Sequence, residues 1–346
     1  LKKKKQKKYY GLSVKNGTDA LILALICAGV KQGDEVITVS HSYIATANSI
    51  RYCNAIPVFI DIDIKTYNMD HNLLESSITN KTKAILCVHQ MGMPCDIRSI
   101  MKIAKKYNLP VIEDAACAVG SEIFHNGHWE KIGKPHADIS CFSFHPRKVL
   151  TTGEGGMITT NNEHFERQLR LLRHQGMSVS DLERHDSEDL IFEDHILLGY
   201  NYRLTDIQAA IGIAQLKKLK NIIEIRRKIA KQYFEILNDI DEITLPLEPD
   251  WAKSNWQSFC IRVNDKLDRN AIMQYLKSQN ISTKTGIMCS HLETAYKTEP
   301  WKANYNLSQS KKARDQSLFL PIFNDLDYED QTYICDKLKY IIKSLL

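Results

Sequence analysis

Short apolar runs alternate with longer segments of helical periodicity over roughly residues 15–225. The short runs predict β-strands at Glu35–Val39, Ile56–Ile60, Ala84–Val88, Pro110–Glu113 and Asp138–Phe144. The longer segments predict helices at Asp19–Ala28, Tyr43–Tyr52, Ile97–Tyr107 and Glu163–Arg173. This alternation is typical of an α/β fold, with a mostly parallel sheet that is covered by helices on both faces.

The C-terminal third has a different pattern. A long helical stretch runs from Thr205 to Leu237, which we interpret as two helices, and Pro246, Pro249 and Trp251 then mark a turn. The remaining pattern predicts a strand (Phe259–Val263), a helix (Asp268–Gln279), a strand (Ile281–Gly286) and a last helix (Tyr328–Ser344). We therefore expect a large domain over residues 1–225 and a smaller α+β domain over residues 226–346.

Lys148 lies between an apolar run, Ile139–Phe144, and a second run, Met157–Thr160. The glycines at 153, 155 and 156 predict a tight turn between two strands. Burial disfavours the ammonium form of a lysine, and a neutral amine can attack an aldehyde to form a Schiff base. A solvated lysine beside a turn is the alternative interpretation.

Two further segments carry candidate chemistry. Asp114 ends an apolar strand, where ligands bind in open α/β sheets, and its carboxylate can pair with a protonated pyridine nitrogen. The alternative for this acid is metal binding or helix capping. Gly17 and Thr18 open the helix that follows Asn16, so its N-terminus can bind a phosphate or can simply be capped.

Together these segments resemble the DegT group of fold-type I, pyridoxal-phosphate-dependent sugar aminotransferases. The resemblance runs almost continuously from Gly17 to about Gln215, and more loosely beyond. Its landmarks are Asn16–Leu21, Gly33–Ile37, Ile112–Ala116, Ser143–Lys148 and Gly199–Arg203. Several landmarks in the same order carry more weight than any one of them.

The resemblance implies a large domain with a mostly parallel, seven-stranded type of sheet, and it assigns roles to residues. Lys148 is expected to hold the cofactor and to move the proton, and Asp114, rather than its neighbour Glu113, to pair with the ring nitrogen. The remaining expected cofactor-binding residues are Gly17, Thr18 and Ser143 for the phosphate, Tyr43 for stacking on the ring, and Asn201 for the phosphate site of a partner subunit. A strand serine and a core aromatic are the ordinary alternatives for Ser143 and Tyr43.

Three residues are candidates on the substrate side: His145, Arg203 and His291. Cys117 departs from the family pattern, because many relatives place glutamine or histidine three residues after the aspartate, and a thiol is a weak hydrogen-bonding group. Gln175 is a milder departure, at a position where relatives often have histidine.

Composition adds less. The chain has 43% hydrophobic and 25% charged residues, as ordinary globular proteins do, and no apolar run near the ~18 residues of a membrane span. Its net charge of +5 depends on six lysines within residues 1–10, which argues against a basic face for nucleic acid. Nine scattered cysteines show no metal-binding spacing and are typical of a reducing compartment.

We therefore expect a cytoplasmic homodimer that binds pyridoxal 5'-phosphate, but neither a metal nor nucleic acid nor a membrane. Its expected reaction transfers an amino group, from glutamate, to a keto group on a nucleotide-linked deoxysugar. The alternatives are a cyclitol aminotransferase, a sugar dehydratase and an inactive binding homologue. A related subgroup of dehydratases has histidine in place of the lysine, so Lys148 favours transamination.

Lys7–Gly11 resembles the end of a helix, and we expect the chain to lack an N-terminal segment that relatives carry.

Overall fold

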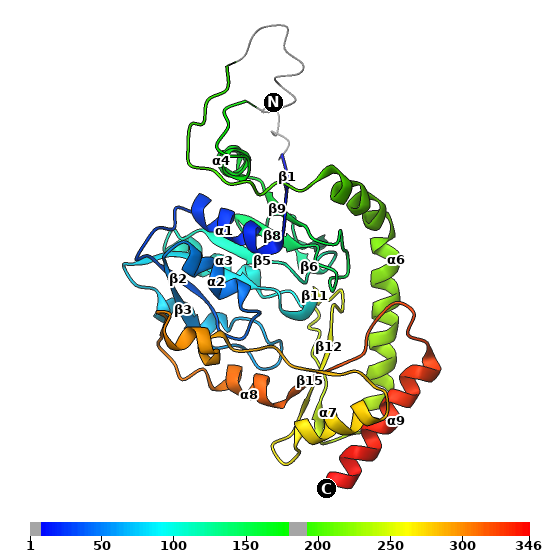
Figure 1. The fold of residues 1–346 in the computed structure, drawn as a ribbon. Helices are drawn as coiled ribbons and strands as arrows, with labels where there is room; N and C mark the ends of the chain where they lie inside the picture. Colours follow the sequence, from blue (N-terminus) through cyan, green and yellow to red (C-terminus); the bar gives the residue numbers. More distant parts are fainter. Residues whose placement is uncertain (1–7, 180–191) are drawn as a thin grey trace.

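The computed structural model describes residues 8–179 and 192–346. Its largest element is an eight-stranded sheet in the order β1-β9-β8-β5-β4-β2-β3-β14 (Figure 1). All its neighbouring strands are parallel except at β9, which is antiparallel to both β1 and β8. The strands are β1 (Tyr10–Val14), β2 (Glu35–Val39), β3 (Ile56–Ile60), β4 (Thr82–Val88), β5 (Val111–Asp114), β8 (Ile139–Ser143), β9 (Gly156–Thr160) and β14 (Lys302–Ala303).

Helices cover both faces of this sheet because successive strand residues point to opposite sides. Ile37, Ile85 and Val111 pack on the face of α3 (Ile97–Lys106). Their neighbours Val36, Ala84 and Ile112 pack on the opposite face, against helices from three parts of the chain. These helices are α1 (Gly17–Cys27), α2 (Ala45–Tyr52) and α4 (Glu163–Arg173). The predicted α/β fold is thus confirmed, although the sheet has eight strands where the resemblance implied seven, because β14 from the C-terminal region pairs with β3.

The second core belongs to the C-terminal region. A four-stranded antiparallel sheet, in the order β10-β12-β15-β13, packs against helices α7 and α9 and the end of α6. These elements are β10 (Ile243–Thr244), β12 (Phe259–Val263), β13 (Lys284–Thr285), β15 (Ser317–Leu320), α6 (Asp206–Leu237), α7 (Arg269–Ser278) and α9 (Tyr328–Leu345). A smaller sheet contains β6 (Glu122–His125), β7 (His128–Lys131) and β11 (Ala252–Lys253).

One long helix replaces the two that we predicted after Thr205. Helix α6 has 32 residues and begins with a capping box between Thr205 and Gln208. Gly212 lies inside it, but a single glycine costs only about 1 kcal/mol relative to alanine and does not end a helix. Figure 1 shows α6 running along one side of the molecule from the large sheet to α9. The predicted boundary at residue 225 falls inside this helix and stays a prediction.

Other differences reflect long-range pairing. The expected helix end at Lys7–Gly11 is wrong for Tyr10 and Gly11, because both belong to β1 and pair with Thr160 and Thr159 of β9. We did not predict β15, which belongs to the four-stranded antiparallel sheet, or helix α8 (Ser308–Gln316). Short 3-10 helices lie at His71–Leu73, Glu75–Ser77, Gln90–Gly92, Ser290–Leu292 and Thr294–Lys297.

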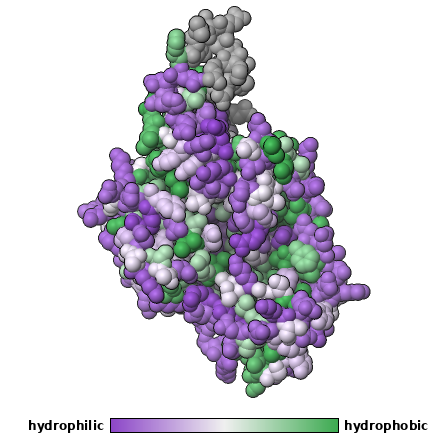
Figure 2. Space-filling view, viewed as in Figure 1, coloured by the Kyte–Doolittle hydropathy of each residue, from purple (hydrophilic) through white to green (hydrophobic). Residues whose placement is uncertain are grey.

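The surface seen in Figure 2 is mostly hydrophilic, with separate apolar areas. None of the helices in residues 8–179 and 192–346 combines the length and the apolar character needed to cross a membrane. The stretch Ser178–His195 is acid-rich and has no steady period, which predicts a mobile surface loop that borders the site, but most of it lies outside the described residues.

Candidate active site

The site lies at one edge of the large sheet, because parallel strands end there together. Asp114 is the last residue of β5 and Ser143 the last of β8. Gly17 opens α1 directly beside Ser143: a Cβ atom added to Gly17 would lie 2.7 Å from the Cβ of Ser143. This closeness shows why glycine is needed at position 17.

Asp114 is buried and is held by two hydrogen bonds. The hydroxyl of Thr46 donates to its Oδ2 at 2.7 Å, and the amide of Ala116 donates to its Oδ1 at 3.2 Å. The hydroxyl of Ser42 lies 2.8 Å from that of Thr46 and extends this network. Thr46 is a site residue that our sequence analysis missed, since nothing in the local pattern distinguishes a threonine in α2.

Glu113, the neighbour of Asp114, has different partners. Its carboxylate accepts a hydrogen bond from Ser140 and lies 3.9 Å from His89 Nε2, and both partners are buried. Successive strand residues point to opposite faces, so the two acids occupy separate environments. Only Asp114 contacts the network of Ser42 and Thr46.

Lys148 lies in the loop between β8 and β9, where its amide donates to the carbonyl of His145 at 2.9 Å. Its Nζ lies 3.1 Å from the sulfur of Cys117. Burial by itself lowers the pKa of Lys148, but Cys117 and the carboxylate of Asp114 raise it, and on balance the pKa lies above its ordinary value. The expectation of a neutral amine is therefore wrong for the chain by itself.

The N-terminus of α1 is capped by Asn16, whose side chain accepts from the amide of Asp19 at 2.8 Å. The side-chain amide of Asn16 also donates to the Asp19 carboxylate. Burial raises the pKa of Asp19, although Lys15 and Asn16 oppose this shift. The N-terminal amides and the Thr18 hydroxyl provide donors for an anion near Ser143.

These residues form a set of complementary groups: a half-buried amine, a buried carboxylate, and a helix N-terminus flanked by hydroxyls. Such a set fits a cofactor with an aldehyde, a basic ring nitrogen and a phosphate. The tight contact between Gly17 and Ser143, and the attraction between Lys148 and Asp114, support this fit.

Comparison with known proteins identifies the family. The family model of the DegT/DnrJ/EryC1/StrS aminotransferases matches residues 3–339. The chain belongs to the DegT/DnrJ/EryC1/StrS aminotransferase family. It is therefore a pyridoxal-phosphate-dependent sugar aminotransferase of fold-type I.

Individual relatives agree with this assignment. GDP-perosamine synthase of Escherichia coli O157:H7 is 36% identical over 329 residues, which cover 95% of this chain and 85% of that protein. The structure of DesV from S. venezuelae in complex with a ketimine intermediate is 30% identical, with a TM-score of 0.86 over 96% of this chain and 84% of that one. The PMP form of the putative sugar aminotransferase Spr1654 from Streptococcus pneumoniae has a TM-score of 0.88 at 27% identity, covering 97% and 88% of the two chains.

Within this aminotransferase, the other predicted residues are placed as follows. Tyr43 is 63% exposed and precedes α2, so the alternative of a buried core aromatic is wrong. Its carbonyl accepts from the amide of Thr46 at 3.1 Å, which places Tyr43 one turn away from the residue that holds Asp114. An exposed ring at this position is available to a bound molecule.

Asn201 and Arg203 lie on a surface segment rather than beside Asp114. Asn201 is exposed and forms a β-bridge with His174, and the guanidinium of Arg203 contacts the same His174 ring. Gln175, beside His174, has a left-handed backbone and donates its amide to the carbonyl of Tyr200 at 2.9 Å. The segment is therefore held at the surface.

The two histidine candidates occupy different environments. His145 lies in the Lys148 loop, where its amide approaches the hydroxyl of Ser143 at 3.4 Å and its ring lies 3.9 Å from Glu154. His291 comes from the C-terminal region, yet its Nδ1 lies 2.5 Å from the hydroxyl of Ser40, just after β2. Burial lowers the pKa of His291 to about 4, so this ring is neutral at pH 7.

Proposed function

We propose that this aminotransferase moves an amino group from glutamate to a keto group of a nucleotide-linked deoxysugar. The observation that carries the proposal is the half-buried amine of Lys148, which lies close enough to the ends of β5 and β8 for Cys117 and the Asp114 carboxylate to raise its pKa. The similarity to GDP-perosamine synthase supports a nucleotide-linked sugar as the substrate. The retained lysine favours transamination over dehydration.

We assign roles to the residues accordingly. When bound, pyridoxal phosphate supplies an aldehyde for the amine and a ring that delocalises the electron pair left on the substrate carbon. Lys148 holds the cofactor and then carries the proton at its Nζ between the two reacting carbons. Asp114, oriented by Thr46, keeps the ring nitrogen protonated, which makes the ring a better electron acceptor.

The remaining cofactor residues bind and orient. The α1 N-terminus at Gly17 and Thr18, with the hydroxyl of Ser143, holds the phosphate. The exposed ring of Tyr43 covers the pyridine face, while His145, Arg203 and His291 contact the substrate. Each of these assignments follows the resemblance of its segment to the family.

We also propose that the active unit is a homodimer in which Asn201 completes the partner's phosphate site. Apolar side chains are exposed on the first half of α6 and on the segment that precedes Asn201. They are Phe192, Ile196, Leu198, Ile207, Ile211, Ile213 and Leu216, with exposed fractions between 44% and 89%. A cluster of this kind on a helical surface is typical of a subunit interface.

The direct test is a substrate panel. The purified chain, loaded with pyridoxal phosphate, is incubated with glutamate and either keto nucleotide sugars or keto cyclitols, and 2-oxoglutarate release is measured. Release with a nucleotide sugar supports the proposal. Release with a cyclitol alone replaces the substrate class, and a chain that neither takes up the cofactor nor releases 2-oxoglutarate is the binding homologue.

We further propose a cytoplasmic location for the protein, which suits the free cysteines among its described residues.

A further inference from the structure

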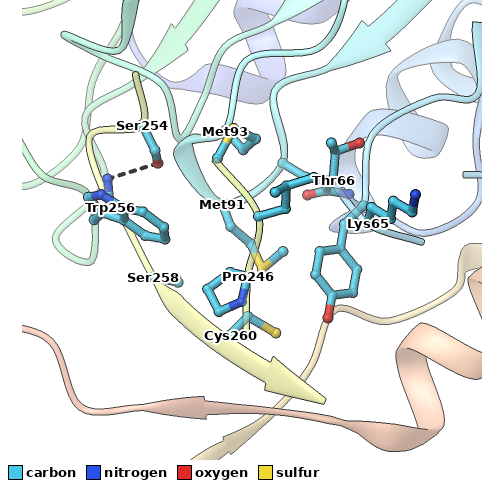
Figure 3. A pocket seen from close by; sticks show the side chains of 12 residues that line it. Lys65, Thr66, Met91, Met93, Pro246, Ser254, Trp256, Ser258 and Cys260 are labelled. Atoms are coloured by element: carbon cyan, nitrogen blue, oxygen red, sulfur yellow. Dashed lines mark hydrogen bonds between the residues drawn. The ribbon is translucent and has the colours of Figure 1, made fainter. Parts of the chain in front are cut away.

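The segment from Ser254 to Ser258 connects β11 to β12 and presents alternate residues to opposite sides. Ser254, Trp256 and Ser258 line a small cavity beside Met91 and Met93 (Figure 3). The amide of Trp256, whose backbone is left-handed, donates to the hydroxyl of Ser254 at 3.0 Å. Asn255 and Gln257, which lie between these residues, form hydrogen bonds with segments of the large domain.

Gln257 contacts the chain on both sides of Lys148. Its side-chain oxygen accepts a hydrogen bond from the amide of Val149 at 2.9 Å. Its side-chain nitrogen donates to the carbonyl of Arg147 at 2.6 Å. One amide group therefore holds the backbone immediately before and immediately after the lysine.

Asn255 holds the opposite side of the Lys148 contact. Its side-chain nitrogen donates to the carbonyl of Cys117 at 2.8 Å and to that of Val119 at 2.9 Å. Cys117 is the residue whose sulfur lies 3.1 Å from Lys148 Nζ. The two residues are themselves linked, since the backbone amide of Gln257 donates to the side-chain oxygen Oδ1 of Asn255 at 2.9 Å.

We propose that Gln257 is a positioning residue for Lys148, and that Asn255 holds the facing Cys117 segment in register with it. This inference rests on the proposed role of Lys148. A reacting group must be held close to its productive geometry, and a misplacement of about 1 Å can cost on the order of 100-fold in rate. The Lys148 loop is thereby tied to the strand β12 that follows Gln257.

Three variants test the proposal. Gln257→Ala removes both hydrogen bonds, while Gln257→Glu keeps the acceptor for Val149 but cannot donate to Arg147 when ionised. Gln331→Ala is the matched control: its side chain donates to the carbonyl of Ile229 at 2.7 Å, within the small-lobe core. It removes a similar hydrogen bond away from Lys148.

The first measurement uses the chain without cofactor. Hydrogen exchange over residues 145–152 is expected to be faster in Gln257→Ala than in the wild type, by roughly tenfold or more at the Val149 amide. The same peptide in Gln331→Ala is expected to exchange at the wild-type rate. Equal exchange in the wild type and in Gln257→Ala would overturn the proposal, whatever the activity.

The second measurement uses the loaded enzyme. In Gln257→Ala, kcat is expected to fall by roughly 10- to 100-fold with the KM for the donor within about threefold, and Gln257→Glu is expected to lie between it and the wild type. A wild-type kcat in Gln257→Ala, when Lys148→Ala is inactive, overturns this inference alone. An active Lys148→Ala overturns the proposed function instead, and the exchange result then still reports whether Gln257 holds the loop.

Discussion

The Nζ of Lys148 lies 3.1 Å from the sulfur of Cys117, the third residue after Asp114. This contact joins the turn after β8 to the segment after β5. Cys117, where many relatives have glutamine or histidine, therefore lies directly beside the proposed catalytic lysine. The residue at position 117 therefore influences Lys148 itself.

Replacing Lys148 with alanine is expected to abolish turnover and the visible absorbance of the bound cofactor, because the attachment point and the proton carrier are the same amine. The fold is expected to persist, since Lys148 lies in a loop. Absorbance and amine transfer are measured together, with circular dichroism as the control. Wild-type values of both would contradict the assignment.

Asp114→Asn is expected to keep part of the cofactor but to slow proton transfer on the order of 10²–10⁴-fold, as the loss of a charge-stabilising contact does elsewhere. Without the carboxylate the ring nitrogen tends to lose its proton and withdraws fewer electrons. Single-turnover kinetics measures this step. A rate within about threefold of the wild type would point to Glu113 or to no acid.

Thr46→Val is expected to slow the same step by roughly tenfold, because a hydrogen bond to a charged group contributes about 1.5–3 kcal/mol and this one orients Asp114. Thr46→Ser keeps the hydroxyl and is the control, with an expected rate near that of the wild type. If Thr46→Val and Thr46→Ser show the same rate in single-turnover kinetics, the hydroxyl does not support Asp114.

Mixing Lys148→Ala and Asn201→Ala chains tests the shared site. In a mixed dimer one site collects both defects and the other collects neither, so activity is expected to rise toward roughly a quarter of wild type when half of the dimers are mixed. Asn201→Ala alone must be clearly impaired, and subunit exchange must be demonstrated by mass. No recovery of activity despite exchange would rule out the contribution of Asn201 to the partner.

Buried histidines are expected to make the fold acid-sensitive. Burial lowers the pKa of His41 to about 3, well below the ordinary value of about 6.5 that it has in an unfolded chain. The unfolded state therefore binds more protons below pH 6.5, and stability that is fully present above this pH is lost as the pH falls toward 3, by at most about 1.4 kcal/mol per pH unit.

Urea unfolding of the wild type and of His41→Phe at pH 7.0, 5.5 and 4.5 measures this loss. The difference in stability between pH 7.0 and 4.5 is expected to be smaller in His41→Phe, whereas His128→Asn, at an exposed position, is expected to follow the wild type. Identical pH dependence in all three proteins would show that His41 is not responsible.

The sequence by itself determined much of the fold. The predicted strands Glu35–Val39 and Ile56–Ile60 have the same bounds in the structure, and Lys148 lies between two paired strands as expected. Apolar periodicity is a local property, and the ordered motifs around Gly17, Asp114 and Lys148 identify the family in the same local way. These features can be recognised without knowing which distant segments meet.

Tertiary structure decided what depends on distant partners. Thr46 and Asp114 are 68 residues apart in the chain, and Gln257 is 110 residues from Arg147, so no local pattern could pair them. The raised pKa of Lys148 has the same origin, because Cys117 and Asp114 outweigh burial only once the ends of β5 and β8 meet. Side-chain contacts and charge balance depend on distances in space, which sequence spacing does not specify.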